Sequence, residues 1–262
     1  MFSERFGKIW PLLTAVFDKC RRRNSSVIGR ADRNLPTPIE AVREFEYLLD
    51  KIDTAEICTN PFNHLHIVNF LNEKHLSTIL QDDQIHFEAC ENTRELIRKI
   101  KSRNYVVQGF PGCVTNIEEY LDFIESGEKK TTDATKEGCG IAFRIQTYKT
   151  PIISNLMMFL NGSECKAAMI RKFKVQDEAV ILTAIQKYLT GYAISPHPDG
   201  RQKCMTYLLN INKDDSVSEF DVHTHLLKFK PEKSFIYDAW KKNSNRDRCW
   251  VPWEWCETVK KN

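Results

Sequence analysis

The apolar pattern of this 262-residue chain changes character near residue 175, and that change limits the folds available to it. Between about residues 90 and 175, apolar side chains recur at helical spacing, most clearly in residues 91–102, 116–126 and 153–162. Apolar runs of strand character follow, separated by polar turns; they cover residues 179–195, 203–212, 221–229 and 234–240. Helices that precede strands in this way favour an α+β fold with an antiparallel sheet or barrel.

The first 55 residues predict a helical extension and a linker. Residues 6–23 read as an amphipathic helix that ends in a basic cluster, where cations favour a helix C-terminus. Residues 23–38 are polar and contain Gly and Pro, so they predict a linker. Residues 37–52 predict a helix with Thr37 as cap and Pro38 in its first turn.

A second domain is expected over residues 56–262. It opens with residues 62–71, whose alternating polarity predicts a strand, and with residues 72–81, which predict a helix capped by Asn72. His64 and His66 alternate with apolar residues on the expected strand and are interpreted as structural.

Composition and the absence of common motifs argue against several classes of function. A formal net charge of +3 gives no argument for nucleic-acid binding. The nine cysteines include no CxxC pair, which is typical of thiols in a reducing compartment and predicts a cytoplasmic location. No apolar run approaches the ~18 residues that span a bilayer, so no membrane span is expected. Gly-rich phosphate loops and a GxSxG elbow are also absent from the sequence.

Two short pairs of residues could hold a metal ion. His197 and Asp199 are separated by one residue and stand between two strand-like runs. Residues two apart on a strand point to the same side, and an imidazole with a carboxylate suits Fe(II). His223 and His225 form a second such pair on a predicted strand. A bare HxD arises often by chance, so a surface turn or a satisfied polar cluster is the alternative.

The wider context of the first pair resembles a known family. The segment "IQKYLTGYAISPHPD", a short spacer and "KCMTYLLNIN" are similar to the Fe(II)- and 2-oxoglutarate-dependent dioxygenases, in their prolyl-hydroxylase-like branch. The resemblance covers residues 60–262 loosely and residues 185–240 best. It implies a double-stranded β-helix, or jelly-roll, with helical support. It also implies Fe(II) and 2-oxoglutarate, with ascorbate as a further candidate cofactor, and hydroxylation of an unactivated C–H bond.

The same resemblance implies roles for individual residues. By motif position, His197 and Asp199 match the first two metal ligands, and the carboxylate of Asp199 favours hydroxylation over halogenation. Tyr188 matches a strand tyrosine near the co-substrate. Asn210 stands where relatives often place a tyrosine that contacts 2-oxoglutarate. Lys228 is expected to face the same cavity as Tyr188 and Asn210.

The chain departs from the family near its end. The family places a second histidine, and then a cation for the co-substrate, after the position of His225, where this sequence has no further histidine. Three readings stay open: the chain ends before the last two strands, His223 or His225 takes the place of the missing ligand, or the protein is a non-catalytic relative that acts as a binding protein. A cupin-like site formed by all four candidate ligands is a further alternative. The substrate, a small molecule or a protein side chain, is not identified.

The C-terminal tail is rich in tryptophan. It holds four of the five tryptophans, Trp240, Trp250, Trp253 and Trp255. Trp250, Trp253 and Arg248 could form an aromatic and basic platform for a sugar, peptide or base, whereas packing against the barrel is the favoured interpretation.

Overall fold

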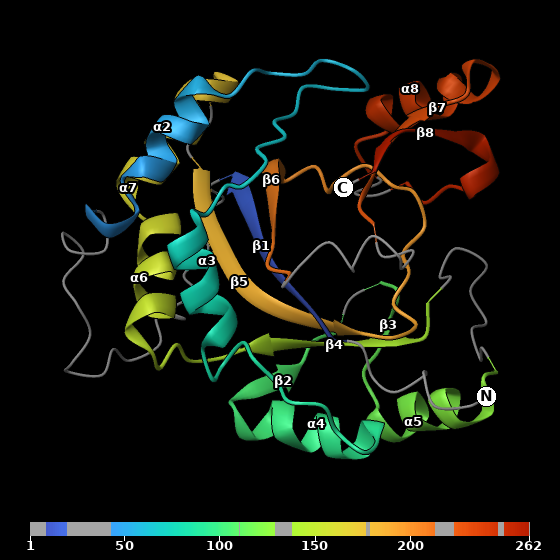
Figure 1. Ribbon diagram of the computed structural model, residues 1–262. Helices are drawn as coiled ribbons and strands as arrows, with labels where there is room; N and C mark the ends of the chain where they lie inside the picture. Colours follow the sequence, from blue (N-terminus) through green and yellow to red (C-terminus); the bar gives the residue numbers. More distant parts are fainter. Residues whose placement is uncertain are drawn as a thin grey trace.

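The computed structural model describes the backbone of residues 9–19 and, with side chains, residues 43–109, 111–128, 138–176, 179–212, 223–245 and 249–261. In these residues the chain is a mixed α+β protein, as expected, with an antiparallel sheet flanked by helices (Figure 1). None of the described helices is long and apolar enough to pass through a membrane.

Most of the described strands belong to one sheet. Its members are β1 (Ile9–Lys19), β2 (Tyr105–Val107), β3 (Cys113–Val114), β4 (Gly140–Ile145), β5 (Ala179–Leu189) and β6 (Lys203–Asn210). The order is β2-β4-β5-β1-β6, all antiparallel, and β3 pairs with β4 in parallel. A separate two-stranded sheet contains β7 (His225–Phe229) and β8 (Cys256–Lys261). The described strands form no closed barrel.

The helices lie mainly in the first two thirds of the chain, as the periodicity predicts. They are α2 (Tyr47–Thr54), α3 (Glu73–Gln81), α4 (Thr93–Ser102), α5 (Ile117–Ser126), α6 (Pro151–Leu160), α7 (Ser163–Phe173) and α8 (Ser234–Lys242). Three of them begin at an asparagine whose side chain accepts a hydrogen bond from a backbone N–H of the first turn: Asn72, Asn92 and Asn116. Such caps satisfy donors that the helix itself leaves unpaired. The predicted Asn72 cap is therefore confirmed.

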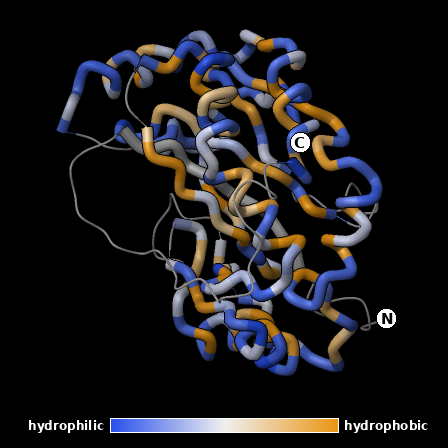
Figure 2. Tube along the Cα trace, turned by 90° about the vertical axis from the view of Figure 1, so that its left-hand side faces the viewer, coloured by the Kyte–Doolittle hydropathy of each residue, from blue (hydrophilic) through white to orange (hydrophobic). Residues whose placement is uncertain are grey.

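One face of the sheet carries the core. Along β5, Ile185, Lys187 and Leu189 alternate in sequence, so they share one face of the strand, and all three are buried. Helix α6 contacts this strand, and α3 and α6 lie beside it (Figure 1). On the opposite side of the same strand, Val180 and Leu182 are exposed. Hydrophobic and hydrophilic segments alternate along the trace of the chain (Figure 2). The alternation of buried and exposed residues along β5 is the signature of a sheet with one covered face.

Three sequence predictions are wrong. The helix expected over residues 6–23 is, where described, strand β1, which is hydrogen-bonded to β5 on one edge and to β6 on the other. Residues 62–71 form no strand beyond an isolated bridge between Cys58 and His64. Residues 234–240 lie in helix α8. The runs at β5, β6 and β7 are strands, as predicted.

The boundary placed at residue 55 stays a prediction, although β1 joins the sheet of the second segment. The linker predicted over residues 23–38 lies outside the described residues. The helix predicted over residues 37–52 is confirmed from residue 43 onward, where a helical turn leads into α2.

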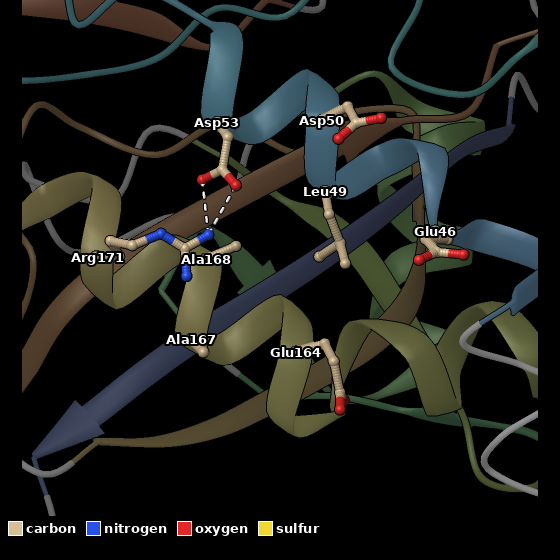
Figure 3. A pocket seen from close by; sticks show the side chains of 8 residues that line it. All are labelled: Glu46, Leu49, Asp50, Asp53, Glu164, Ala167, Ala168 and Arg171. Carbon is tan, nitrogen blue, oxygen red and sulfur yellow. Dashed lines mark hydrogen bonds and ion pairs between the residues drawn. The ribbon is translucent and has the colours of Figure 1, made fainter.

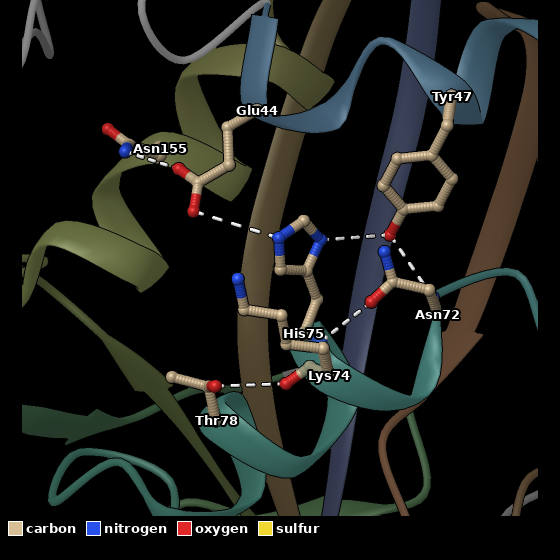
Figure 4. Close-up of polar contacts among 7 residues, drawn as sticks. All are labelled: Glu44, Tyr47, Asn72, Lys74, His75, Thr78 and Asn155. Atoms are coloured by element: carbon tan, nitrogen blue, oxygen red, sulfur yellow. Dashed lines mark hydrogen bonds and ion pairs between the residues drawn. The ribbon is translucent and has the colours of Figure 1, made fainter.

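A polar network connects the helices that cover the core (Figure 4). The hydroxyl of Tyr47 lies 3.1 Å from Nδ1 of His75, and it accepts a hydrogen bond from the backbone N–H of Asn72. Nε2 of His75 lies 3.8 Å from a carboxylate oxygen of Glu44, whose other oxygen accepts a bond of 2.6 Å from Asn155. The side chain of His75 is only 12% exposed. The network thus fixes α2, α3 and α6 relative to one another.

Lys187 is the most unusual residue of the core, because it is a fully buried lysine. Its Nζ donates a hydrogen bond of 2.8 Å to the carbonyl oxygen of Ile85. The same atom lies 4.7 Å from the ring centre of Phe87 and 5.6 Å from that of Tyr105. Burial, and then the nearby charge of Arg103, lower the pKa of Lys187 to about 7. The Lys187 amine is therefore contacted by two aromatic rings and one carbonyl oxygen rather than by a carboxylate.

We expect Lys187 to make the folded protein more stable as the pH rises above 7. Its pKa is lower in the folded protein than in the unfolded chain, so between pH 7 and pH 10 the unfolded chain binds the extra proton. The free energy of unfolding is then expected to rise with pH, by up to about 1.4 kcal/mol per pH unit, and this increment should be missing in Lys187→Met. Urea denaturation of both proteins at pH 7 and pH 9.5 measures the difference in slope. Parallel pH profiles would contradict the assignment.

Candidate functional site

The His197–Asp199 pair lies in the connection between β5 and β6. The two flanking strands are as predicted, but the pair itself is in the loop and not on a strand. The loop begins at Gly191, whose φ is +90° and whose carbonyl oxygen accepts hydrogen bonds of 2.9 Å from the N–H groups of Cys139 and Gly140. A Cβ at residue 191 would come within 2.5 Å of the Phe123 ring. Only glycine fits this turn.

The tail of the chain holds the loop from the other side. The N–H of Val251 donates a hydrogen bond of 3.0 Å to the carbonyl oxygen of Pro196. The ring of Trp250 packs against the ring of His197, with centres 4.3 Å apart. Val251 and Ser195 are both buried. The position of His197 is therefore set by contacts distant in sequence, which the HxD motif alone does not predict.

His197 has one ring nitrogen fixed by the backbone. Its Nδ1 lies 2.7 Å from the carbonyl oxygen of Ser195, an atom that can only accept a hydrogen bond. Nδ1 must therefore carry the proton, and in the neutral ring the lone pair is then on Nε2. A hydrogen bond from the remote ring nitrogen to a backbone carbonyl is the usual support of a metal-binding histidine.

Asp199 is held as an anion. Its Oδ2 accepts a hydrogen bond of 2.7 Å from the Thr206 hydroxyl, and its Oδ1 is 2.9 Å from Nζ of Lys203. Partial burial raises the pKa of Asp199, but the hydrogen bonds from Thr206 and Lys203, together with the charges of Lys203 and His197, outweigh it and hold the pKa below the usual value. The carboxylate is thus ionised and already has a cation beside it.

Tyr188 and Asn210 share a face of the sheet with Thr206 but lie far from it. In the strand register Tyr188 pairs with Trp10, Asn210 with Leu12, and Thr206 with Val16. All three partners have the same parity along β1, so the three residues face the same side. At ~3.3 Å per residue, however, Tyr188 is ~20 Å and Asn210 ~13 Å along the sheet from Thr206, which holds Asp199.

The second histidine pair lies on the smaller sheet. His225 on β7 contacts Thr258 of β8 at 3.1 Å, and its ring centre is 5.1 Å from that of Trp253. The ring centres of His223 and His225 are 6.2 Å apart. Lys228 forms an ion pair of 3.1 Å with Glu257 on the same sheet. Within the described residues, no three His, Cys, Asp or Glu side chains are grouped so as to hold a metal ion. The four candidate ligands are therefore not gathered into one centre.

The tail tryptophans pack against individual side chains. Trp250 contacts His197 and Trp253 contacts His225, while Nζ of Lys233 lies 5.2 Å from the Trp255 ring. These contacts agree with packing. Arg248, the basic member of the alternative platform, lies outside the described residues. The early histidine His64 is buried, and its Nδ1 contacts the carbonyl oxygen of Phe62, which fits a structural role.

A shallow hollow of about 580 Å³, widely open to solvent, is lined in part by Asp199. Residues that follow α7, the start of β6 and Trp240 of α8 line it. Its charged side chains are Lys174, Asp199, Arg201 and Lys203. The sequence does not predict this hollow, because it forms where three segments that are distant along the chain meet.

A second hollow of about 400 Å³ lies between α2 and α7 (Figure 3). Glu46, Asp50 and Glu164 line it, and one guanidinium nitrogen of Arg171 donates bonds of 2.9 and 2.7 Å to the two carboxylate oxygens of Asp53. This ion pair ties the two helices together. A cluster of acidic side chains does not by itself identify a ligand.

Comparison of the chain with protein-family models, with curated proteins and with solved structures finds no match.

The environment of Asp199 can be tested by removing one of its donors. In Thr206→Val the carboxylate keeps its partial burial but loses a hydrogen bond, so the pKa of Asp199 is expected to rise. Carbon-13 NMR titration of the aspartate carboxyl groups measures it. The matched control is Thr183→Val, which removes a hydroxyl contact of 2.9 Å to Tyr207 and leaves Asp199 untouched. An equal shift in both variants would show that the Thr206 bond does not set this pKa.

Proposed function

We propose that His197 and Asp199 are two protein ligands of an Fe(II) site, and that the protein is a 2-oxoglutarate-dependent oxygenase that hydroxylates a C–H bond of its substrate. The observation that carries the proposal is the 2.7 Å contact between Nδ1 of His197 and the carbonyl oxygen of Ser195. It places the lone pair of the neutral ring on Nε2, in a loop that also presents an ionised carboxylate two residues later.

The donor types fit Fe(II). Imidazole nitrogen and carboxylate oxygen are the ligands of the 2-His-1-carboxylate sites that non-haem oxygenases use. The packing of Trp250 on the ring of His197 limits its rotation and thereby lowers the entropy lost when the nitrogen coordinates. When bound, Fe(II) supplies the means to activate O2, and the co-substrate is converted to succinate and CO2 as the substrate gains a hydroxyl group.

The described residues supply only two ligands to the proposed metal ion, His197 and Asp199. The described residues offer no third His, Cys, Asp or Glu beside the pair, so the proposal requires a further ligand that is not among them. Tyr188 and Asn210 are too distant along the sheet to contact a co-substrate that coordinates a metal at Asp199, because 2-oxoglutarate is far shorter than ~13 Å. The role proposed here for the chain is therefore limited to His197, Asp199 and their immediate supports.

The protein's own groups have defined tasks in such a site. The Ser195 carbonyl orients the imidazole, and Thr206 holds one oxygen of Asp199 so that the other can face a metal ion. Lys203 supplies the counter-charge of Asp199 in the absence of metal and must move away when a divalent ion binds. The proposal extends to a helix-supported double-stranded β-helix, of which the six-stranded sheet would be one wall.

A second candidate is a non-catalytic relative that acts as a binding protein. The Lys203–Asp199 ion pair favours it, because the ammonium group already satisfies the carboxylate that a metal would need. The two candidates differ in whether a divalent ion can displace Lys203.

Metal titration separates them. The parent is expected to bind Co(II), a spectroscopic substitute for Fe(II), and His197→Ala should weaken that affinity at least ~10-fold, since even the supports of a metal ligand contribute 10–100-fold. Visible absorption of the Co(II) ion measures the binding. His225→Ala is the matched control, because it removes a histidine that also packs on a tryptophan but lies on the smaller sheet.

The control also tests the alternative ligand. Loss of affinity in His225→Ala would make that residue a ligand after all. Equal affinities of the parent and His197→Ala would exclude the metal site and leave the binding protein. Formation of succinate from 2-oxoglutarate, measured in the same three proteins with Fe(II), is expected to be weak in the parent and absent in His197→Ala.

A further inference from the structure

We infer that helix α8 and the turn before it bind a single-stranded polynucleotide. The residues of this surface are Lys233, Tyr237, Trp240, Lys241 and Trp255, here called the α8 surface. They lie in the C-terminal part of the chain, with β7 and β8, apart from the helices that cover the core (Figure 1). Binding at this surface needs no metal ion and does not rest on the proposed function.

The positive charge of the chain is concentrated around this surface. Residues 223–261 contain nine Lys or Arg and five Asp or Glu, whereas the other residues contain 29 and 30. The whole-chain net charge of +3 therefore hides a basic segment in a chain that is otherwise close to neutral. Lysines gathered in one segment attract a polyanion, because each phosphate that they neutralise releases a counterion.

The same segment leaves its aromatic rings only partly covered. Val251 is the one buried hydrophobic side chain that the structure describes in residues 223–261, and helix α8 has no buried residue. Tyr237 is 38% exposed, and Trp240 and Trp255 are partly exposed. A group of exposed rings marks an interaction site, whereas single exposed apolar residues are ordinary. Each ring offers a face on which a base of any identity can stack.

Lysines and rings alternate along one side of α8. Lys233, Tyr237 and Lys241 are four residues apart, so they lie in a row about 12 Å long. Nζ of Lys241 lies 5.0 Å from the centre of the Tyr237 ring, and Nζ of Lys233 lies 5.2 Å from that of Trp255. The Trp240 ring stacks on Tyr237, with centres 5.6 Å apart. These lysines contact rings rather than carboxylates, so each can turn to a phosphate while a base takes its place on the ring.

The C-terminal end of α8 is anchored separately from this row. Arg201 donates hydrogen bonds to the carbonyl oxygens of Trp240 and, at 2.9 Å, of Asn243. Its guanidinium also stacks on the Trp240 ring, 4.3 Å from the ring centre. Because Arg201 is engaged in these contacts, it is not counted among the cations that a ligand would meet. Its role is to hold the helix in place, which lowers the entropy lost when a ligand binds.

An anionic membrane is the other ligand that lysines and aromatic rings suit. A helix that lies on a membrane presents a continuous apolar face. Phe235 is the most exposed ring of α8, at 64%, but Asp238 and Lys242 follow it three and seven positions later, on the same side of the helix. That side is therefore not continuously apolar, and the row that contains Tyr237 lies on a different side. The arrangement favours the polynucleotide.

The test is fluorescence anisotropy of a labelled oligouridine titrated with the full chain at low ionic strength. The parent is expected to bind, with an affinity that falls as salt is added. Tyr237→Ala should weaken binding at least ~5-fold, because one base loses its stacking partner, whereas Tyr237→Phe keeps the ring and should bind like the parent. Lys241→Gln should reduce the slope of log affinity against log salt by about 0.7, the value for one phosphate contact with a single strand.

Two variants serve as matched controls. Phe235→Ala removes a more exposed ring from another side of α8, and Lys101→Gln removes the charge of an exposed lysine on α4. Both should bind oligouridine like the parent. An absence of binding by the parent, or equal weakening in Tyr237→Ala and Phe235→Ala, would overturn the inference.

Two further ligands separate the alternatives. A duplex of the same length should bind more weakly than oligouridine, because paired bases cannot stack on the rings; equal affinity would mean that only phosphates are contacted and would overturn the inference. Vesicles that contain phosphatidylserine test the membrane. Binding to these vesicles without binding to oligouridine, lost in Phe235→Ala, would identify a membrane surface and would also overturn it.

Discussion

The hydrogen bonding of β5 along both of its edges is the constraint on which the rest of the structure depends. This 11-residue strand pairs with β4 on one side and with β1 on the other. Its inward residues supply the floor on which α6 packs, and its end at Leu189 fixes where the HxD loop begins. Because side chains alternate along a strand, a slip of one residue would expose Ile185 and Leu189 and turn Gln186 and Tyr188 toward the helices. The burial of the core and the position of the candidate site are therefore set by one register.

The sequence was most informative where local signals and burial agree. The helices at Asn72, Asn92 and Asn116 have both a capping side chain and an apolar stripe, so their type follows from the sequence. Residues 9–19 have no such agreement. Their apolar pattern fits a helix. However, the edges of β5 and β6 offer hydrogen-bond partners to the backbone of this segment, and because of this long-range pairing the segment forms a strand. The run at residues 234–240 shows the reverse case, in which a short apolar segment forms helix α8.

Of the candidate metal site, the sequence predicts only the two possible ligands and not the residues that hold them in place. The spacing of His197 and Asp199, and the strands on either side, follow from the sequence. The support of the histidine by Trp250 and of the loop by Val251 does not, because these contacts join residues some 50 positions apart. The same reasoning explains why Tyr188 and Asn210 looked like neighbours of the pair. They share the face of the sheet that carries Thr206, but β1 stands between β5 and β6 and sets a register that separates them from Thr206 along the strands.

Lys203 determines how readily the proposed metal site could form. Its ammonium nitrogen lies 2.9 Å from Oδ1 of Asp199, while the Thr206 hydroxyl donates to the other carboxylate oxygen. On the proposal, a divalent ion at Asp199 competes with this ammonium for the same carboxylate, whereas the hydrogen bond from Thr206 can persist in both states. The ion pair that helps to keep Asp199 ionised in the protein alone is, on this argument, also the interaction that lowers the affinity of the carboxylate for a metal.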